Sequence, residues 1–349
     1  MEGVWSAEDT TPGAIEGALR ELLRERYTQD HHGIPARVLN LVVVVDGDWR
    51  GEIENRLSRT GRYHPSRTIV CATEERRTTI DAVVTLGADS DDDEDDATPL
   101  RERIELKVGR QHVEHLATIV DPLVITDVAT VVWAPHGHAD AVDSLGALAQ
   151  VVLLDSVEEP EPREAIARAA ELAERAYVVD LAWLRSTPWR ERITASFDPP
   201  MWRSELAAIN SVTVRHNPSS VAAATLLLGW LSSRLGWRPG SVVGGGGALT
   251  GRARGRRGDV AMRLEPAGQD VPGLAGITVE TSRGMSLSLD RGEGGLRAVR
   301  RSRDGSESAW TLLGASRGES GILGEGIRQA LLRDPTYQPA VQAAGQMLG

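Results

Sequence analysis

The chain has 349 residues, of which 41% are hydrophobic and 26% charged. This is the composition of an ordinary water-soluble globular protein, and the length allows two domains. The net charge of −11 is concentrated in one segment, because residues 89–96 hold seven acidic side chains. This balance excludes a general nucleic-acid-binding protein, which would be basic. We predict that the acidic run is a solvated loop.

The first 236 residues are predicted to alternate helices and strands. Continuous apolar runs are typical of buried strands, whereas apolar residues repeated every three or four positions are typical of helices. In chain order we expect a helix opening at Thr11 and Pro12, a strand at 38–45, a helix at 49–57, a strand at 67–72, an element at 79–86, strands at 104–108 and 128–133, a helix at 141–149, a strand at 151–154 and a helix at 164–176. A further helix at 219–235 is framed by Asn217 as cap, Pro218 in the first turn and Gly236 as stop.

The pattern changes after residue 236. Residues 237–258 are rich in Pro, Gly and Arg and include four consecutive glycines at 244–247, which predicts a linker or loop. Apolar residues then alternate with polar ones, as in Met285, Leu287 and Leu289, and this period is typical of strands with one buried face. A last helix carries Leu323 and Ile327.

These elements predict an α/β fold. We expect an N-terminal α/β domain over 1–236, with a mixed sheet covered by helices. We expect a Gly/Arg-rich linker or loop over 237–258, and a smaller C-terminal α+β domain over 259–349. The smaller domain is predicted to be an antiparallel meander backed by one helix.

Cysteine usage and hydropathy suggest a cytoplasmic location. The single cysteine, Cys71, lies in the apolar run 68–72, where it is expected to act as a small buried hydrophobe. The N-terminus is acidic and has no apolar core typical of a secretion signal. The longest apolar segment, 221–231, is shorter than the roughly 20 residues that a membrane-spanning helix requires.

Asp46 and Asp48 follow the predicted strand 38–45 and resemble the paired aspartates of haloacid-dehalogenase-type phosphatases, which act as nucleophile and general acid. That pattern requires Thr or Val at position 50, which is Arg here, and a downstream Lys, whereas Lys107 lies within a strand. A turn after a strand is the better interpretation. The same junction lacks the G-x-G-x-x-G pattern of a dinucleotide site.

His136 and His138 with Asp140 follow the predicted strand 128–133 and imitate part of a metallo-β-lactamase zinc site. A complete site has His at position 141, which is Ala, and more histidines downstream than His216 alone. We therefore predict a polar loop and no metal site. Similarly, the four glycines lack the Lys-Ser/Thr of a phosphate-binding loop. Their neighbours Arg252, Arg254, Arg256 and Arg257 suggest either solvated arginines or a surface for phosphate or an acidic partner.

Residues 179–198 are the most distinctive segment, with Trp183, Arg185, Trp189 and Arg190 inside eight positions. Thr187 is predicted to cap a helix with Pro188 in its first position. Trp189, Ile193 and Phe197 would share one face of that helix, and this face is expected to lie in the core. The alternative is a partner-binding anchor, because Trp and Arg dominate many interfaces. The arginines are expected at the surface or paired with a carboxylate, and Asp180 is the nearest.

The order of several motifs resembles the glucose-6-phosphate dehydrogenase assembly proteins, the OpcA family. The segment 180–198 is similar to the family's D-L-A-W-x-R-x-x-P-W-R run. His64, Pro65, Ser66 and Arg67 resemble its H-P-S-R motif before a strand, and the segment 226–235, including Trp230, resembles its L-L-x-G-W-L-x-S-R-L motif. A weaker resemblance covers 127–135, and the C-terminal part agrees only in outline.

The resemblance implies a non-enzymatic accessory protein that promotes assembly or allosteric activation of glucose-6-phosphate dehydrogenase, and so supports NADPH supply through the oxidative pentose phosphate pathway. It implies glucose-6-phosphate dehydrogenase as partner, with Asp180, Trp183, Arg185, Trp189 and Arg190 as candidate partner-binding residues. No cofactor, nucleic acid or membrane is implied, and self-association stays open. The alternative is a metal-dependent hydrolase or phosphatase acting on sugar phosphates or nucleotides, using Asp46 and Asp48 or the two histidines.

Overall fold

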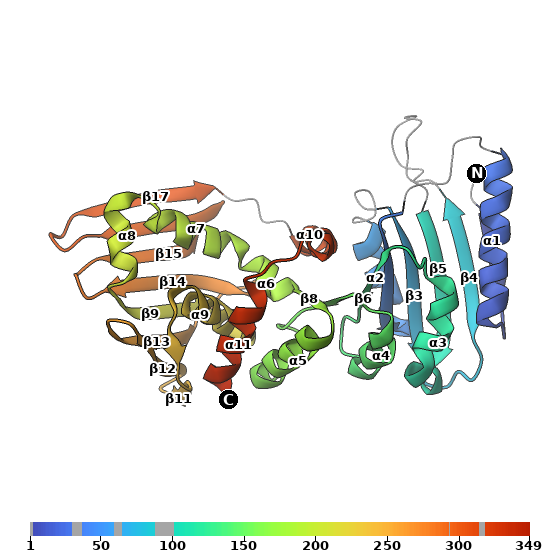
Figure 1. The fold of residues 1–349 in the computed structure, drawn as a ribbon, viewed down its shortest axis with the longest axis horizontal. Helices are drawn as coiled ribbons and strands as arrows, with labels where there is room; N and C mark the ends of the chain where they lie inside the picture. The colour runs from blue at the N-terminus through green and yellow to red at the C-terminus, as the bar shows by residue number, and fades with distance from the viewer. Residues whose placement is uncertain (1–2, 30–36, 59–64, 88–100, 293, 314–317) are drawn as a thin grey trace. The chain divides into compact units, whose positions relative to one another are not determined.

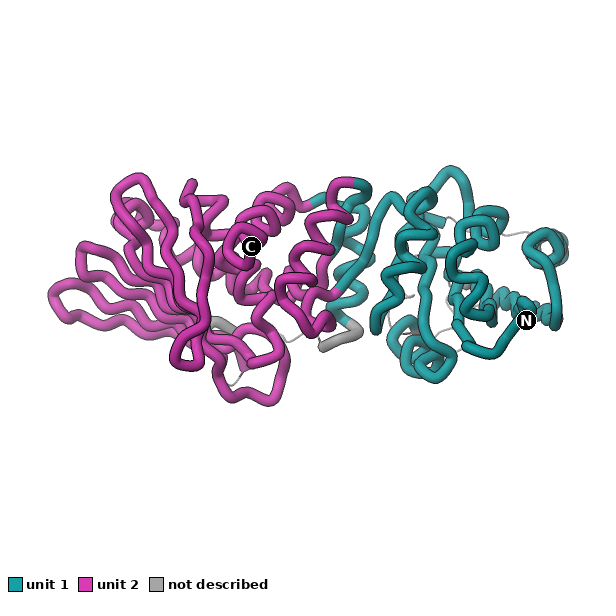
Figure 2. The backbone as a smooth tube through the Cα atoms, turned by 90° about the horizontal axis from the view of Figure 1, so that it is seen from below, with its two compact units in different colours: residues 1–154, 175–179, 318–333 teal, residues 155–174, 180–317, 334–349 magenta. Residues whose placement is uncertain are grey.

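A computed structural model of the chain describes residues 3–29, 37–58, 65–87, 101–292, 294–313 and 318–349. The chain forms two compact units (Figure 2). Unit 1 comprises residues 1–154, 175–179 and 318–333, and unit 2 comprises residues 155–174, 180–317 and 334–349. His64 and the acidic run 89–96 lie outside the described residues.

Unit 1 is built on a mixed eight-stranded sheet with the order β1-β4-β5-β3-β2-β6-β7-β8. The central pairs β5–β3, β3–β2, β2–β6 and β6–β7 are parallel, and β1 and β4 extend the sheet in antiparallel fashion. The strands are β1 Gly3–Ala7, β2 Leu39–Asp46, β3 Ser66–Glu74, β4 Asp81–Gly87, β5 Arg101–Gly109, β6 Ala129–Trp133, β7 Val151–Leu154 and β8 Tyr177–Asp180.

The buried apolar runs explain why these strands form the middle of the sheet. Seven consecutive residues of β2, from Leu39 to Val45, are buried. Because successive side chains point to opposite faces, both faces of the sheet must be covered. The helices of this unit are α1 Pro12–Gln29, α2 Arg50–Ser58, α3 Leu116–Val120, α4 Ala139–Ser144 and α10 Gly318–Leu331 (Figure 1). The predicted α/β character and the burial of Cys71, which is 0% exposed, are confirmed.

Unit 2 is built on a nine-stranded sheet with the main order β10-β12-β13-β9-β14-β15-β16-β17, and β11 pairs with β12. The strands are β9 Ile209–His216, β10 Arg238–Pro239, β11 Val243–Gly245, β12 Ala248–Gly255, β13 Gly258–Pro266, β14 Leu274–Thr281, β15 Ser286–Gly292, β16 Gly295–Arg301 and β17 Glu307–Leu313. Its helices are α5 Pro162–Arg175, α6 Leu181–Arg185, α7 Thr187–Phe197, α8 Pro200–Leu206, α9 Val221–Leu235 and α11 Tyr337–Leu348.

One face of this second sheet packs against the helices. Val212, Met262 and Leu287 from three strands join a buried cluster with Phe197 of α7 and Leu228 of α9. As predicted, Asn217 caps the turn before α9, and Gly236 ends α9 in the left-handed conformation with φ 67°. A glycine adopts this conformation without the steric penalty of a Cβ atom.

Three expectations for the C-terminal part need correction. Residues 237–258 are not a linker, since they form β10, β11 and β12 of the sheet. The predicted boundary at residue 236 differs from the division into units, because β9 precedes it yet pairs with both β13 and β14. The helix carrying Leu323, α10, belongs to unit 1, and the sheet of unit 2 is covered by several helices rather than one. Contacts between residues far apart in the sequence determine these assignments.

Candidate functional site

Asp180 is the first residue of segment 180–198 and is almost completely enclosed, with 1% exposure. It caps α6, because its carboxylate accepts a hydrogen bond from the Ala182 backbone N–H at 2.9 Å. The backbone N–H of Ser156 donates to the same oxygen at 3.1 Å, and its hydroxyl donates to the other at 2.5 Å. The Tyr337 hydroxyl of α11 also donates to Asp180, at 3.1 Å. Neutral donors alone therefore satisfy this carboxylate.

The surroundings of Asp180 favour its protonated form. Burial, followed by the nearby charge of Asp155, raises the pKa of Asp180 from 3.8 to about 6, although hydrogen bonds from Ser156 and Ala182 act in the opposite direction. A buried carboxylate without a cation pays the cost of lost hydration. Enclosure is therefore the main cause of the raised pKa of Asp180.

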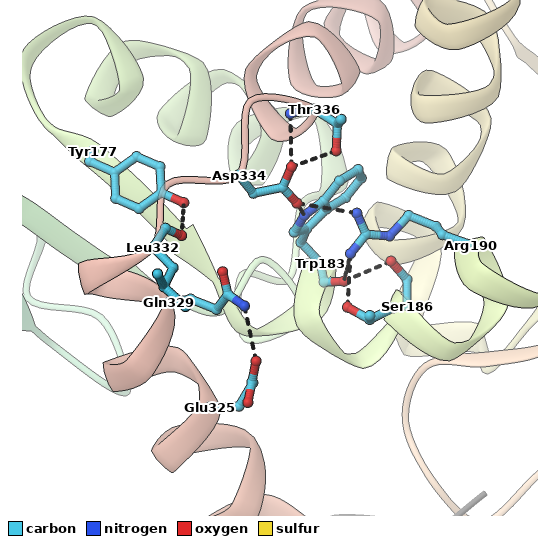
Figure 3. Close-up of polar contacts among 10 residues, drawn as sticks. Tyr177, Trp183, Ser186, Arg190, Glu325, Gln329, Leu332, Asp334 and Thr336 are labelled. Carbon is cyan, nitrogen blue, oxygen red and sulfur yellow. Dashed lines mark hydrogen bonds and ion pairs between the residues drawn. The ribbon is translucent and has the colours of Figure 1, made fainter. Parts of the chain in front are cut away.

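Trp183 and Arg190 form a second polar cluster with Asp334 (Figure 3). The Arg190 guanidinium carbon lies 3.5 Å from the centroid of the Trp183 ring. The Asp334 carboxylate accepts a hydrogen bond from the Trp183 indole N–H at 2.9 Å and lies 3.5 Å from Arg190 Nη1. Burial lowers the pKa of Arg190 to about 10, and the charge of Asp334 opposes that shift. The cluster thus holds a buried guanidinium between an aromatic face and a carboxylate.

The partners of both arginines differ from the expectation. Asp180 pairs with neither: Arg185 donates to Asp155 at 2.7 Å, and Arg190 lies beside Asp334. The expected cap at Thr187 is also wrong, because Ser186 precedes the helix and Thr187 is its first residue. The Thr187 hydroxyl instead accepts a hydrogen bond from Arg190 Nη2 at 2.8 Å. Asp334 lies more than 140 positions from both Trp183 and Arg190, so the local sequence could not indicate it as their partner.

The apolar face of α7 lies in the core, as expected. Trp189, Ile193 and Phe197 are each at most 3% exposed and pack in the buried cluster of unit 2. Among the candidate partner-binding residues, Arg185 is the most open, with a side chain that is 18% exposed. Most motif side chains of segment 180–198 thus lie inside unit 2.

Arg67 has a comparable internal role in unit 1. Its Nε donates to Glu102 at 2.8 Å and its Nη1 donates to the Leu123 carbonyl at 2.8 Å. Arg37 donates to the other oxygen of Glu102, whose side chain is only 1% exposed. Of the two residues before Arg67, Pro65 accepts a backbone hydrogen bond and Ser66 begins β3. The motif arginine thus joins β3 to β5 through a buried ion pair.

The glycine in segment 226–235 permits a close helix contact. A Cβ atom at Gly229 would lie 2.2 Å from the Ala340 carbonyl oxygen and 3.1 Å from the Ala344 nitrogen of α11. Only a residue without a side chain allows α9 and α11 to approach this closely. The neighbouring Trp230 is partly buried against the core of unit 2. This motif is therefore explained by packing.

The two incomplete catalytic patterns meet at one edge of the unit 1 sheet. Asp46 ends β2 and His138 follows β6, and the sheet pairs these strands in parallel. His138 Nε2 lies 3.4 Å from Asp46 Oδ1, and His136 stacks on Trp49 with ring centroids 4.9 Å apart. Both histidines have positive φ, of 65° and 58°, which is an uncommon backbone conformation. In the sequence, the aspartate pattern at Asp46 and the histidine pattern at His138 are about 90 positions apart, and the fold brings them together.

The chemistry available at this edge is limited. No group of three or more His, Cys, Asp or Glu residues suited to a metal occurs within the described residues. Strand order reverses between β2 and β6, the position at which open α/β sheets bind ligands. Here β2 leads into Asp46 and a short 3₁₀ turn at Gly47–Trp49, whereas dinucleotide sites present a glycine-rich turn to the phosphates. Carboxylates at this position would repel a pyrophosphate.

Two family models match this chain, one over its N-terminal part and one over its C-terminal part. Residues 58–171 match the family model described as the glucose-6-phosphate dehydrogenase subunit N-terminal domain, and residues 176–341 match that of the C-terminal domain. The chain belongs to the OpcA family of glucose-6-phosphate dehydrogenase assembly proteins. The resemblance drawn from Arg67, segment 180–198 and Trp230 is thereby confirmed.

Curated relatives in the family are named "Putative OxPP cycle protein OpcA". The chain is 28% identical to the Synechococcus elongatus protein over 142 residues, which are 40% of this chain and 32% of that protein. It is 31% identical to the Nostoc punctiforme protein over 131 residues, or 36% and 28% of the two chains. The chain therefore spans about a third of the length of the curated relatives it matches.

The comparison with solved structures found one likeness at the level of the fold and weaker ones beside it. An oxidoreductase from Sinorhizobium meliloti superposes with a TM-score of 0.50 and 11% identity, covering 89% of this chain and 95% of that chain. The transcriptional regulator Gal80p from Kluyveromyces lactis gives a TM-score of 0.49 at 9% identity, covering 88% and 87%. At such low identity the first likeness concerns the fold only.

Proposed function

We propose that this OpcA-family protein acts as a non-enzymatic accessory protein of glucose-6-phosphate dehydrogenase, promoting its assembly or activating it allosterically. The action would support NADPH supply by the oxidative pentose phosphate pathway in the cytoplasm. The observation that carries the proposal is the pair of family matches, which together span both units. No described helix has the length and apolar character needed to cross a membrane.

The geometry of the motifs supports a binding role over catalysis. Arg67, Asp180 and Arg190 are all buried and engaged with neighbouring groups. A catalytic group must be accessible to its substrate, whereas a residue that only holds a binding surface in place can be buried. We propose that segment 180–198 supports the surface that meets the dehydrogenase, and that Arg185, the most exposed of the five candidate partner-binding residues, lies nearest to that surface.

A direct test mixes the protein with the dehydrogenase from the same organism. We expect a change in kcat or in KM for glucose 6-phosphate, and co-elution of the two proteins at micromolar concentrations. Heat-denatured protein is the control for added mass. Unchanged kinetics together with separate elution would contradict the proposal.

The basic hairpin of unit 2 is a second place to probe for dehydrogenase contact. Arg254, Arg256 and Arg257 are exposed at the β12–β13 turn, within the segment first expected to be a linker. Exposed arginines attract acidic surfaces over short distances. Replacing Arg256 and Arg257 by Glu should slow association with an acidic partner surface without unfolding the sheet. An unchanged association rate would exclude this hairpin from the contact.

A hydrolase is the alternative from a different functional class. The 3.4 Å approach of His138 to Asp46 is the observation that favours it. A screen of the pure protein against sugar phosphates and nucleotides, with added Mg²⁺ or Zn²⁺, tests this alternative. Turnover that is lost in Asp46→Asn would establish the hydrolase and displace the accessory function.

A further inference from the structure

The sheet of unit 2 has two unlike faces. Val260, Met262 and Leu264 of β13 point to the covered face and are at most 2% exposed, while Ala261 and Arg263 between them are exposed. Strand register carries the uncovered face across β13, β9, β14, β15, β16 and β17 in three rows. They are Ala261, Ser211, Glu280, Ser286, Arg301 and Glu307; Arg263, Thr213, Thr278, Ser288, Val299 and Ala309; and Glu265, Arg215, Gly276, Asp290, Arg297 and Thr311.

The middle row consists mainly of short side chains of similar size. Arg263 at one margin is its only long side chain, and the five other positions carry Thr, Ser, Val or Ala. Sheets stack face to face about 10 Å apart, which requires side chains that do not project far. The row therefore has a relief suited to another flat surface.

Gly276 keeps the charged part of the face flat. The Arg215 guanidinium of β9 donates to Thr278 of the adjacent strand β14 at 3.0 Å and reaches Asp290 of β15, the next strand but one, at 2.7 Å. A Cβ atom at Gly276 would lie 2.4 Å from the Asp290 oxygen and 2.7 Å from Arg215 Nε. Because that atom is missing, the arginine lies along the sheet, where it meets Asp290.

The charges on the face are balanced. The three rows contain four arginines and four carboxylates, whereas the chain as a whole has a net charge of −11. Three ion pairs form within the face: Arg215–Asp290, Arg263–Glu265 and Arg301–Glu307. The remaining two, Glu280 and Arg297, make no ion pair with another described residue. One charge of each sign is thus available to a partner.

The positions of these two charges are related by Ser288. Glu280 lies on β14 in one outer row, Arg297 lies on β16 in the opposite outer row, and Ser288 lies on β15 midway between them. A two-fold axis running along the face through Ser288 can exchange the two positions. In a two-fold dimer, residue i meets residue j and j meets i. Each Glu280 would then face the Arg297 of the second copy.

We propose that the uncovered face of the unit 2 sheet binds a second copy of this chain, with reciprocal Glu280–Arg297 pairs around Ser288. The three rows on six strands supply eighteen positions, close to the roughly 20–30 residues per side of a standard interface. A neutral face also lets two negatively charged chains approach with little repulsion. The inference goes beyond the proposed function and does not depend on it.

The first test is a charge-swap cycle read by sedimentation equilibrium at about 1–100 µM protein. The parent chain should form a dimer. Glu280→Arg or Arg297→Glu alone should weaken dimerisation on the order of tenfold or more, because each puts like charges opposite one another, and the double swap should restore most of the loss. Arg234→Glu, at an exposed position near the C-terminal end of α9, is the matched control and should leave dimerisation unchanged.

Three outcomes of the charge-swap cycle would overturn the proposed dimer. A parent chain that stays monomeric throughout the concentration range rules out the dimer. A dimer that tolerates both single reversals places the interface elsewhere, and a double swap no better than the singles refutes the reciprocal pair. Circular dichroism melts of each variant confirm that the chain remains folded. The effect on the dehydrogenase, measured in parallel, reports on the proposed function alone.

A second test uses the cysteine content of the chain. Cys71 is the only cysteine and is 0% exposed, so a new surface cysteine would supply the reactive thiol. Ser288→Cys should give a covalent dimer with a short bis-maleimide, because Ser288 of each copy lies beside the axis. Ser204→Cys, exposed on α8, should not. Equal cross-linking of both variants would indicate random collision and overturn the proposal.

Discussion

Unit 1 and unit 2 each bury a carboxylate beside a family motif, and each carboxylate is only 1% exposed. Glu102 in unit 1 lies between the guanidinium groups of Arg37 and Arg67. Asp180 in unit 2 accepts hydrogen bonds from Ser156, Ala182 and Tyr337, all of them neutral donors. The same degree of burial is thus stabilised in one unit by charge and in the other by hydrogen bonding.

This difference determines how each unit responds to substitution and to pH. Removing a buried carboxylate that bonds two guanidinium groups leaves both arginines without their anion. A buried carboxylate with neutral partners is satisfied in either protonation state but is less stable when ionised. The stability of unit 1 should therefore fall when Glu102 loses its charge by substitution. The stability of unit 2 should fall when Asp180 becomes ionised.

The largest effect is expected for Glu102→Gln. Removing one partner of a buried ion pair typically costs about 3–5 kcal/mol, so unit 1 should unfold at much lower denaturant concentration. Hydrogen exchange followed by mass spectrometry separates the peptides of unit 1 from those of unit 2. The loss of protection should be concentrated in β3 and β5.

Glu105→Gln is the matched control for that change. Glu105 lies on the same strand with its side chain 21% exposed, and it pairs with Arg103 at 2.7 Å. Pairs in contact with water contribute about 1 kcal/mol or less. Equal losses for Glu102→Gln and Glu105→Gln would show that the buried ion pair of Arg67 has no special weight.

The second effect concerns pH and Asp180. The pKa of Asp180 is about 6 in the folded chain and roughly 3.9 when unfolded. Because the folded state binds the proton more tightly, the stabilising contribution is fully present below pH 4 and is lost as pH rises through 6. Two pKa units correspond to about 3 kcal/mol. Asp180→Asn should remove this dependence, so the variant gains about that much relative to the parent between pH 4 and pH 7.

Urea unfolding of parent and Asp180→Asn at several pH values measures this difference. Comparing the two chains cancels the titration of groups elsewhere. A stability difference that stays constant with pH would contradict the raised pKa. A difference that moves the opposite way would mean that a cation stabilises the Asp180 carboxylate, as in unit 1.

Sequence patterns predicted the parts of the fold that depend on neighbouring residues. The apolar run of β2, the cap at Asn217 and the stop at Gly236 all depend on a few adjacent positions, and each was found. The membership of β9 and α10 was not predicted. β9 alternates in the usual way, but its pairing with β13 crosses the whole of α9. Only long-range contacts assign such elements to a sheet or unit.

The candidate site shows the same limit. The periodicity of Trp189, Ile193 and Phe197 correctly predicted a buried face. The partner of Arg190 was not predictable, because Asp334 lies 144 positions away in a segment with no recognisable motif. The meeting of Asp46 with His138 likewise depends on β2 and β6 being neighbours. Residue types indicated which groups need partners, and the fold determined which partners they have.

A third effect compares helix packing in the two units. Gly229→Ala places a methyl group against the Ala340 backbone, and overpacking of this kind typically costs about 1–3 kcal/mol. In unit 1, a Cβ atom at Gly17 of α1 would meet nothing within 4 Å. Gly17→Ala should therefore stabilise by about 0.5–1 kcal/mol through helix propensity. A Gly229→Ala variant that melts at the same temperature as the parent or above it would refute the close α9–α11 contact.

The smallest effect separates the two arginines of segment 180–198. Arg190 needs a planar group, because it stacks on Trp183 while donating to Thr187. Lysine keeps the charge but loses the stacked plane and the fork of N–H donors, so Arg190→Lys should cost about 1–2 kcal/mol. Arg185 is more open to water and bonds Asp155, so Arg185→Lys should cost less than about 1 kcal/mol.

The same pair of variants decides how the segment acts on the dehydrogenase. If Arg190 supports the binding surface from inside, Arg190→Lys should weaken the effect on the dehydrogenase only as far as it lowers the melting temperature. If Arg185 lies near the contact, Arg185→Lys should alter binding while the melting temperature hardly moves. Binding lost in Arg190→Lys at unchanged stability would show instead that Arg190 becomes exposed to the partner. Unit 2 would then have to open around Trp183 and Asp334 when the complex forms.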